Sequence, residues 1–112
     1  MSRYRLSLPA RVPNRGAHLL AWSLGTEPDL AAAVTDLERR VGIGMVDRLL
    51  RGEVIPAGEL GQDIWLATRG EVPAKEWRRP AVGRWFEPPS CAFVRALRDR
   101  RVADAPPGPG TA

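Results

Sequence analysis

The chain has 112 residues, 44% of them hydrophobic, which suits one compact domain. A single cysteine, Cys91, excludes a disulfide within the chain and suits a reducing compartment. The longest strongly apolar run, residues 30–34, is too short to cross a bilayer, and no continuous apolar stretch follows the first arginines. We therefore expect a cytoplasmic protein without a signal peptide or a membrane partner.

Charge is distributed unevenly along the chain. Residues 1–26 contain four arginines and no acid, residues 27–76 contain six basic and ten acidic residues, and residues 77–112 contain seven basic and three acidic residues. The formal net charge of +4 therefore comes from the two ends. A basic protein favours an anionic partner such as nucleic acid, whereas the acidic middle disfavours contact with phosphates.

The first half of the chain begins with an Arg- and Pro-rich segment, residues 1–16, which predicts an extended arm or a short strand. A first helix is expected over residues 17–24. Thr26 and Asp29 have the spacing of a capping box, which predicts Thr26 as the N-cap of a second helix that ends at Gly42. The apolar stripe of this second helix consists of Leu30, Val34, Leu37 and Val41.

A short glycine-containing turn, Gly42-Ile43-Gly44, follows the second helix. It leads into a third helix expected over residues 45–51, which Gly52 ends. The side chains expected to face inward are Ile43, Val46, Leu49 and Leu50. After a loop that contains Pro56, a fourth helix is expected over residues 57–69.

The last third of the chain predicts a single helical turn over residues 73–77 and a loop over residues 80–89, which contain three prolines. Ser90 is expected to cap a final helix that extends to Arg101. Residues 102–112 predict a disordered tail, because they offer little apolar surface to bury. Trp77 and Trp85 are expected to be partly exposed, and the other two tryptophans to be in the core.

Three segments resemble the lambda-repressor/Cro-like helix-turn-helix domains, in the small form found in prophages. They are Val46-Asp-Arg-Leu-Leu-Arg-Gly52, then Pro56, then Ile64-Trp-Leu-Ala-Thr-Arg-Gly70-Glu-Val72. These segments are similar to the recognition helix, the following loop and the fourth helix of that family, and the resemblance covers about residues 18–77. The turn Gly42-Ile43-Gly44 departs from the family pattern, because it is shorter and offers no Ser, Thr, Asp or Asn as a cap.

The resemblance implies an all-α fold of five to six short helices. Residues 1–16 would be a basic N-terminal arm, residues 17–79 the helix-turn-helix domain, residues 80–101 a loop and C-terminal helix, and residues 102–112 a disordered tail. It also implies a sequence-specific DNA-binding transcriptional regulator of the repressor kind, of phage or prophage type, which binds double-stranded DNA as a homodimer.

The outward side chains near the start of the third helix would contact base edges. By the resemblance these lie near Gly44 and are Met45, Asp47 and Arg48, with Arg48 suited to guanine. Phosphate contacts are expected from Arg39, Arg40 and Arg51. The basic ends would add further phosphate contacts through Arg3, Arg5, Arg11 and Arg15 on one side and Arg78, Arg79 and Arg84 on the other.

The final helix carries an apolar stripe of Phe93, Val94 and Leu97, which predicts a dimer or partner surface. A second hypothesis is a phage-encoded protein-binding adaptor, inhibitor or antitoxin built on the same fold, because a fold alone does not decide function. An enzyme is not expected. His18 is the only histidine, no Cys/His cluster has metal-ligand spacing, and neither a phosphate-binding glycine loop nor a nucleophile elbow is present, so we expect no metal and no cofactor.

Overall fold

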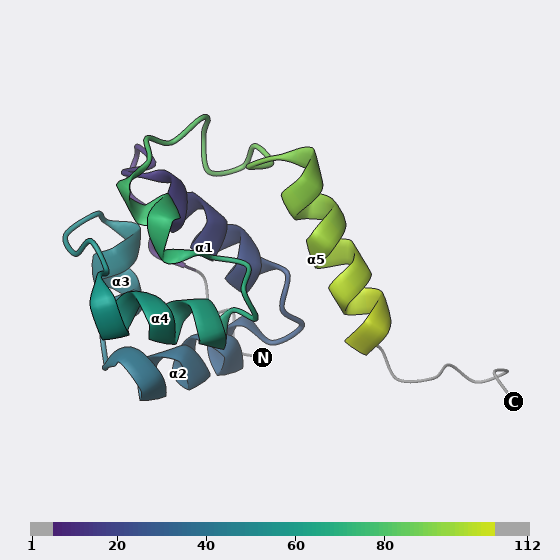
Figure 1. Cartoon of the computed structure of the whole chain (residues 1–112), viewed down its shortest axis with the longest axis horizontal. Helices are drawn as coiled ribbons and strands as arrows, with labels where there is room; N and C mark the ends of the chain where they lie inside the picture. The colour runs from purple at the N-terminus through teal and green to yellow at the C-terminus, as the bar shows by residue number, and fades with distance from the viewer. Residues whose placement is uncertain (1–5, 105–112) are drawn as a thin grey trace, which may run out of the picture.

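The computed structural model describes residues 6–104, and every regular element in that range is a helix (Figure 1). The elements are α1 (Arg15–Gly25), α2 (Leu30–Val41), α3 (Met45–Leu50), α4 (Gly58–Ala67), the 3-10 helix η1 (Ala74–Arg78) and α5 (Cys91–Asp104). The predicted all-α class is confirmed. Residues 6–14 form neither helix nor strand, and the ends of the predicted arm and tail, residues 1–5 and 105–112, lie outside the described residues.

The core forms where α1, α2, α3, α4 and η1 meet, and its largest fully buried side chain is Trp77. The expectation that Trp77 is partly exposed is wrong, since only 1% of it is exposed. Gly16 on α1 explains the difference: a Cβ atom there would lie 2.3 Å from Cδ2 of Trp77, so only glycine lets the indole ring approach the helix. Trp85 is half-buried, as expected.

The start of α2 also differs from the sequence-based expectation. Asp29, and not Thr26, is the N-cap, and its carboxylate accepts a hydrogen bond from the backbone N–H of Ala32 at 3.1 Å. Thr26 instead caps the end of α1, where its hydroxyl donates to the carbonyl of Ser23 at 3.0 Å. Both residues are good capping residues, and the pattern did not show which helix each one caps.

Two segments without regular structure are held together over α1. The indole N–H of Trp85 donates to the carbonyl of Pro9 at 2.7 Å, and the indole N–H of Trp22 on α1 donates to the carbonyl of Trp85 at 2.8 Å. Nε2 of the buried His18, also on α1, donates to the carbonyl of Glu87 at 2.8 Å. The loop 80–89 therefore connects the N-terminal segment to α1.

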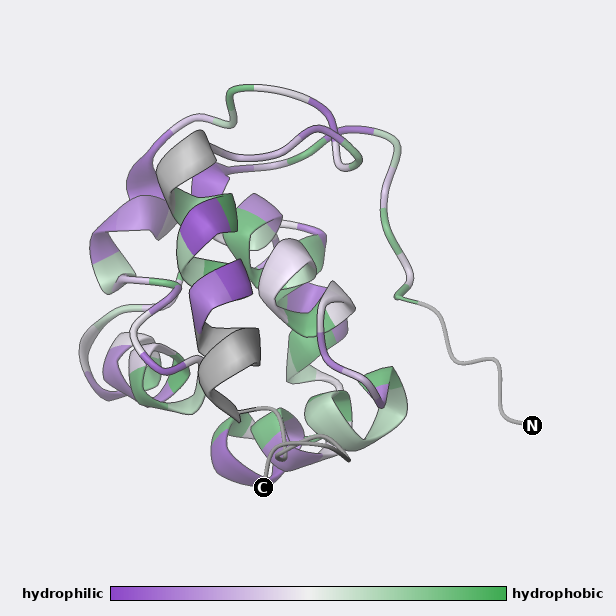
Figure 2. Ribbon diagram, turned by 90° about the vertical axis from the view of Figure 1, so that its right-hand side faces the viewer, coloured by the Kyte–Doolittle hydropathy of each residue, from purple (hydrophilic) through white to green (hydrophobic). Residues whose placement is uncertain are grey.

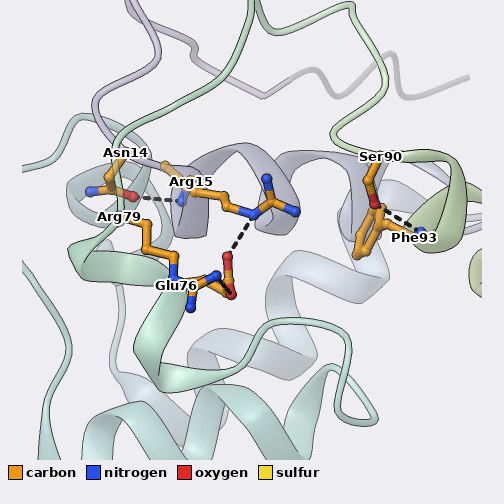
Figure 3. A network of polar contacts seen from close by, with 7 residues as sticks. Asn14, Arg15, Glu76, Arg79, Ser90 and Phe93 are labelled. Atoms are coloured by element: carbon orange, nitrogen blue, oxygen red, sulfur yellow. Dashed lines mark hydrogen bonds and ion pairs between the residues drawn. The ribbon is translucent and has the colours of Figure 1, made fainter.

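Helix α5 lies to one side of the other helices (Figure 1). Its predicted cap is confirmed, because the hydroxyl of Ser90 accepts a hydrogen bond from the N–H of Phe93 at 3.1 Å (Figure 3). The helices combine hydrophobic and hydrophilic residues (Figure 2), as expected where one face packs and the other meets water. No helix in the described range combines the length and the hydrophobicity that a membrane span requires.

Candidate nucleic-acid interface

The connection between α2 and α3 is a tight turn that fixes the start of α3. The N–H of Met45 donates to the carbonyl of Gly42 at 3.2 Å, which closes a four-residue β-turn. Gly44, at the third position, has φ 79° and ψ −2°, and Ile43 is not among the described residues with positive φ. These angles define a type II turn, in which the third position requires glycine. The two glycines therefore have a geometric role, and Ile43 occupies the outer corner.

Glu38 on α2 supplies the cap that the turn sequence lacks. Its Oε2 atom accepts hydrogen bonds from the N–H of Gly44 at 2.9 Å and from the N–H of Val46 at 3.4 Å. These are two of the amides that the first turn of an α-helix leaves without an intrahelical partner. The orientation of α3 is therefore fixed by a side chain of the preceding helix. The capping role of Glu38 was not predicted from the sequence, because this residue lies before the turn and not in it.

Ile43 was expected to face inward, and this expectation is wrong. The residue is 98% exposed, because the corner of a type II turn directs its side chain away from both helices. The apolar spacing of Ile43, Val46 and Leu50 suggested one helical face, but α3 begins only at Met45. Val46 and Leu50 are buried as expected. The turn thus presents an isolated aliphatic side chain to solvent.

The three residues predicted to contact bases have different surroundings. Arg48 is exposed and forms no ion pair with any described residue. Asp47 is half-buried, and Met45 is half-buried and packs against the core. The exposed guanidinium of Arg48 is therefore the most accessible polar group on α3, whereas Met45 is partly used in packing.

The arginines predicted to bind phosphates around α2 and α3 are all exposed. Arg39 pairs with Asp36 at 3.4 Å and Arg51 with Glu53 at 3.7 Å. Arg40 forms no ion pair within the part of the chain that the structure describes. Ion pairs between such exposed side chains contribute little to stability, so the two paired arginines can exchange their carboxylates for phosphates at small cost.

Two other arginines that were predicted to contact phosphates form ion pairs with a buried carboxylate instead. Nε of Arg15 lies 2.6 Å from Oε2 of Glu76, and a guanidinium nitrogen of Arg79 lies 3.4 Å from Oε1 of the same residue (Figure 3). The side chain of Glu76 is only 8% exposed, and that of Arg15 is 24% exposed. A buried carboxylate needs its positive partners. Arg15 therefore stabilises the fold, while Arg79, which is 57% exposed, keeps part of its guanidinium accessible.

Three carboxylates of the acidic middle of the sequence are engaged in contacts within the fold. Glu76 is buried between two arginines, Glu38 is directed at the backbone of α3, and Glu71 accepts a hydrogen bond from the hydroxyl of Ser23 at 2.9 Å. The stretch 39–51 contains four arginines and one acid. The sum over residues 27–76 thus hides a locally basic segment that contains the turn and α3.

The N-terminal segment meets the domain at the end of α3. A Cβ atom on Gly52, which has φ 75°, would lie 2.5 Å from Cβ of Pro13, so these two residues are in close contact. Arg11 precedes this contact and is exposed, as are Arg78 and Arg84. Arg3 and Arg5 lie outside the described residues.

The predicted partner surface on α5 is largely occupied by the chain itself. Leu97 is 3% exposed, and Phe93 packs against the core. Val94 is half-buried and lines a shallow depression with Pro88, Arg95 and Arg98. Of the three predicted residues, Val94 is the one that is neither buried nor packed against the core.

Comparison with known proteins identified no relative of the chain. No protein-family model, no curated protein and no solved structure matches the chain.

Proposed function

We propose that the chain is a sequence-specific DNA-binding transcriptional regulator of the lambda-repressor/Cro-like kind, in which α2 and α3 are the helix-turn-helix and α3 enters the major groove. The observation that carries the proposal is the combination of Arg48 on α3, which is exposed and has no ion pair with any described residue, with a turn that Glu38 holds in place. A recognition helix needs both an exposed donor and a fixed orientation. Arg48 supplies the donor, which in bidentate geometry suits guanine.

Phosphate contacts in this proposal come from the exposed arginines beside the turn and from the basic ends. Arg39, Arg40 and Arg51 flank α3, and Arg11 and Arg78 add positive charge from outside the helix pair. Such contacts fix the register of a protein on the duplex and supply affinity that decreases with salt. We propose that the chain acts as a cytoplasmic homodimer on a palindromic site, since two-fold symmetry of protein and DNA match in this class.

The experiment that tests the proposal is a selection from a randomised duplex library, followed by titration of the enriched duplex and a scrambled duplex at two salt concentrations. The proposal expects at least a thousandfold preference for the enriched duplex, roughly the lower limit for specific binders, and a binding constant that falls steeply with salt. Equal, weak binding of both duplexes would contradict it.

A second candidate function is a protein-binding adaptor, inhibitor or antitoxin. The observation that favours it is an apolar projection on the loop 80–89, where Val82 and Phe86 are each 74% exposed. Phe86 lines a groove together with Trp85, Val12 and the two exposed arginines Arg11 and Arg84. Exposed apolar surface of this kind is typical of protein contacts. The adaptor function predicts that no duplex is enriched in the selection.

A further inference from the structure

We infer that Ile43 is a specificity-determining residue that contacts the C5 methyl group of a thymine in the major groove. The inference rests on the proposed function and names what the turn between α2 and α3 recognises on the duplex. The thymine methyl is the apolar group on the major-groove edge of a base pair, and apolar side chains are the groups that contact it.

Exposure of Ile43 is the first observation, but a single exposed aliphatic residue is common on protein surfaces. What distinguishes Ile43 is its rigid support. It is 98% exposed at the corner of a type II turn whose flanking residues, Gly42 and Gly44, have φ 115° and 79°. The N–H of Gly42 donates to the carbonyl of Glu38 at 2.8 Å, and the N–H of Gly44 donates to the carboxylate of Glu38 at 2.9 Å. The aliphatic side chain therefore projects from a fixed point.

The neighbours of Ile43 favour DNA over a protein partner. Arg40 precedes the turn and Arg48 follows it, and both are exposed and unpaired among the described residues. These arginines place positive charge on both sides of Ile43 in the sequence, which suits a partner lined by phosphates and bases. A purely apolar protein surface would instead have to desolvate both charges.

Met45 does not serve as the apolar contact, because it is half-buried and packs against the core. Ile43 is the large aliphatic side chain that the turn leaves fully to solvent. With Arg48 on guanine and Ile43 on thymine, the pair would distinguish two different base pairs of one half-site. The enriched sequence is then expected to contain a thymine close to a guanine in each half-site.

The test replaces each thymine of the enriched duplex, one at a time, by deoxyuridine, which removes only the methyl group. The wild-type chain is expected to lose about fourfold in affinity at one thymine per half-site, the factor that corresponds to one buried methyl group. Ile43→Ala should bind the thymine and deoxyuridine duplexes equally. Val82→Ala, which shortens another exposed β-branched side chain on the distant loop 80–89, should keep the wild-type discrimination.

Three results would overturn the inference. If replacement by deoxyuridine has no effect on affinity at any position, the thymine contact is ruled out, whereas the proposed DNA-binding function still stands. Unchanged discrimination by Ile43→Ala would assign the methyl contact to another residue. If no duplex is enriched, the proposed DNA-binding function is wrong, and the thymine contact is wrong with it. The exposed Ile43 would then be available to a protein partner. The deoxyuridine series uses the wild-type chain, so its negative result overturns the inference whether or not the variant folds, and Ile43→Val, a smaller change at the same exposed position, provides a second variant for assigning the contact.

Discussion

The carboxylate of Glu38 accepts a hydrogen bond from the backbone N–H of Gly44 at 2.9 Å, across the turn that joins α2 to α3. The same oxygen accepts a second hydrogen bond from Val46. A helix of only six residues gains little from its own hydrogen bonds, because nucleation is costly. The start of α3 is therefore stabilised by a residue of another helix, and its orientation depends on that residue.

Replacing Glu38 by alanine should weaken this attachment. We expect Glu38→Ala to lower the free energy of unfolding by about 0.5–2 kcal/mol, the range for the loss of a helix cap. Glu38→Gln should lose less, since its amide oxygen still accepts a hydrogen bond. Urea unfolding followed by circular dichroism measures both. Thr35→Ala, at an exposed position on the same helix, is the matched control and should leave stability nearly unchanged. Equal effects of Glu38→Ala and Thr35→Ala would show that the cap has no energetic role.

The positive φ of Gly44 gives a second prediction. Gly44→Ala should cost about 1–2 kcal/mol, because an L-residue in the left-handed region brings its Cβ close to the following carbonyl. Space is not the limit, since a Cβ atom at Gly44 would meet no other atom within 4 Å. Gly44→Asn should cost less than Gly44→Ala, because asparagine tolerates that conformation. Thermal unfolding of the two variants checks the order, and a reversed order would contradict the type II turn.

Gly16 gives a third prediction that concerns the core. Gly16→Ala places a methyl group against the indole ring of Trp77, at 2.3 Å from its Cδ2 atom. Overpacking of a well-packed core costs about 1–3 kcal/mol, and the short distance places this variant at the upper end. Gly25→Ala on the same helix meets no atom within 4 Å and should be neutral or slightly stabilising. A stable Gly16→Ala variant with unchanged tryptophan fluorescence would contradict the close packing.

Sequence analysis predicted the helices well, because their apolar spacing and their glycine and proline boundaries are local features. It failed where an interaction joins distant residues. The burial of Trp77 depends on Gly16, and the cap of α3 depends on Glu38, six residues before Gly44. It also failed where two local patterns compete, as when Asp29 rather than Thr26 begins α2. The pairing of Arg15 with Glu76 likewise joins residues far apart in the sequence.

The ion pair with Glu76 distinguishes Arg15 from Arg11, although both were predicted from the sequence to contact phosphates. Arg15→Ala should destabilise the fold by about 2 kcal/mol, less than for a fully buried pair because Arg15 is partly exposed. Arg11→Ala should leave stability unchanged and weaken binding to all duplexes alike, with a salt dependence reduced by about one counterion. Urea unfolding and salt-dependent titrations of both variants test the contrast. Equal loss of salt dependence in the two variants would show that Arg15 also reaches phosphates.

Arg48 carries the predicted base preference. Arg48→Ala should lower the affinity for the enriched duplex by about fivefold to 150-fold, equivalent to about 1–3 kcal/mol for a lost bidentate contact, and should relax the preference at one guanine. Because Arg48 is exposed and forms no ion pair within residues 6–104 as the structure describes them, the fold should be unaffected. Arg98→Ala, an exposed arginine on α5, is the matched control. An equal loss for both variants would indicate general electrostatic attraction and no base contact.

The measurement that tests the central claim most directly is a nuclear magnetic resonance titration of the isotope-labelled chain with the enriched duplex. If α2 and α3 form the DNA-binding face, the largest amide shifts fall within residues 39–51, with smaller shifts near Arg11. Shifts concentrated in the loop 80–89, or none at all at a duplex concentration above that of the protein, would contradict the account.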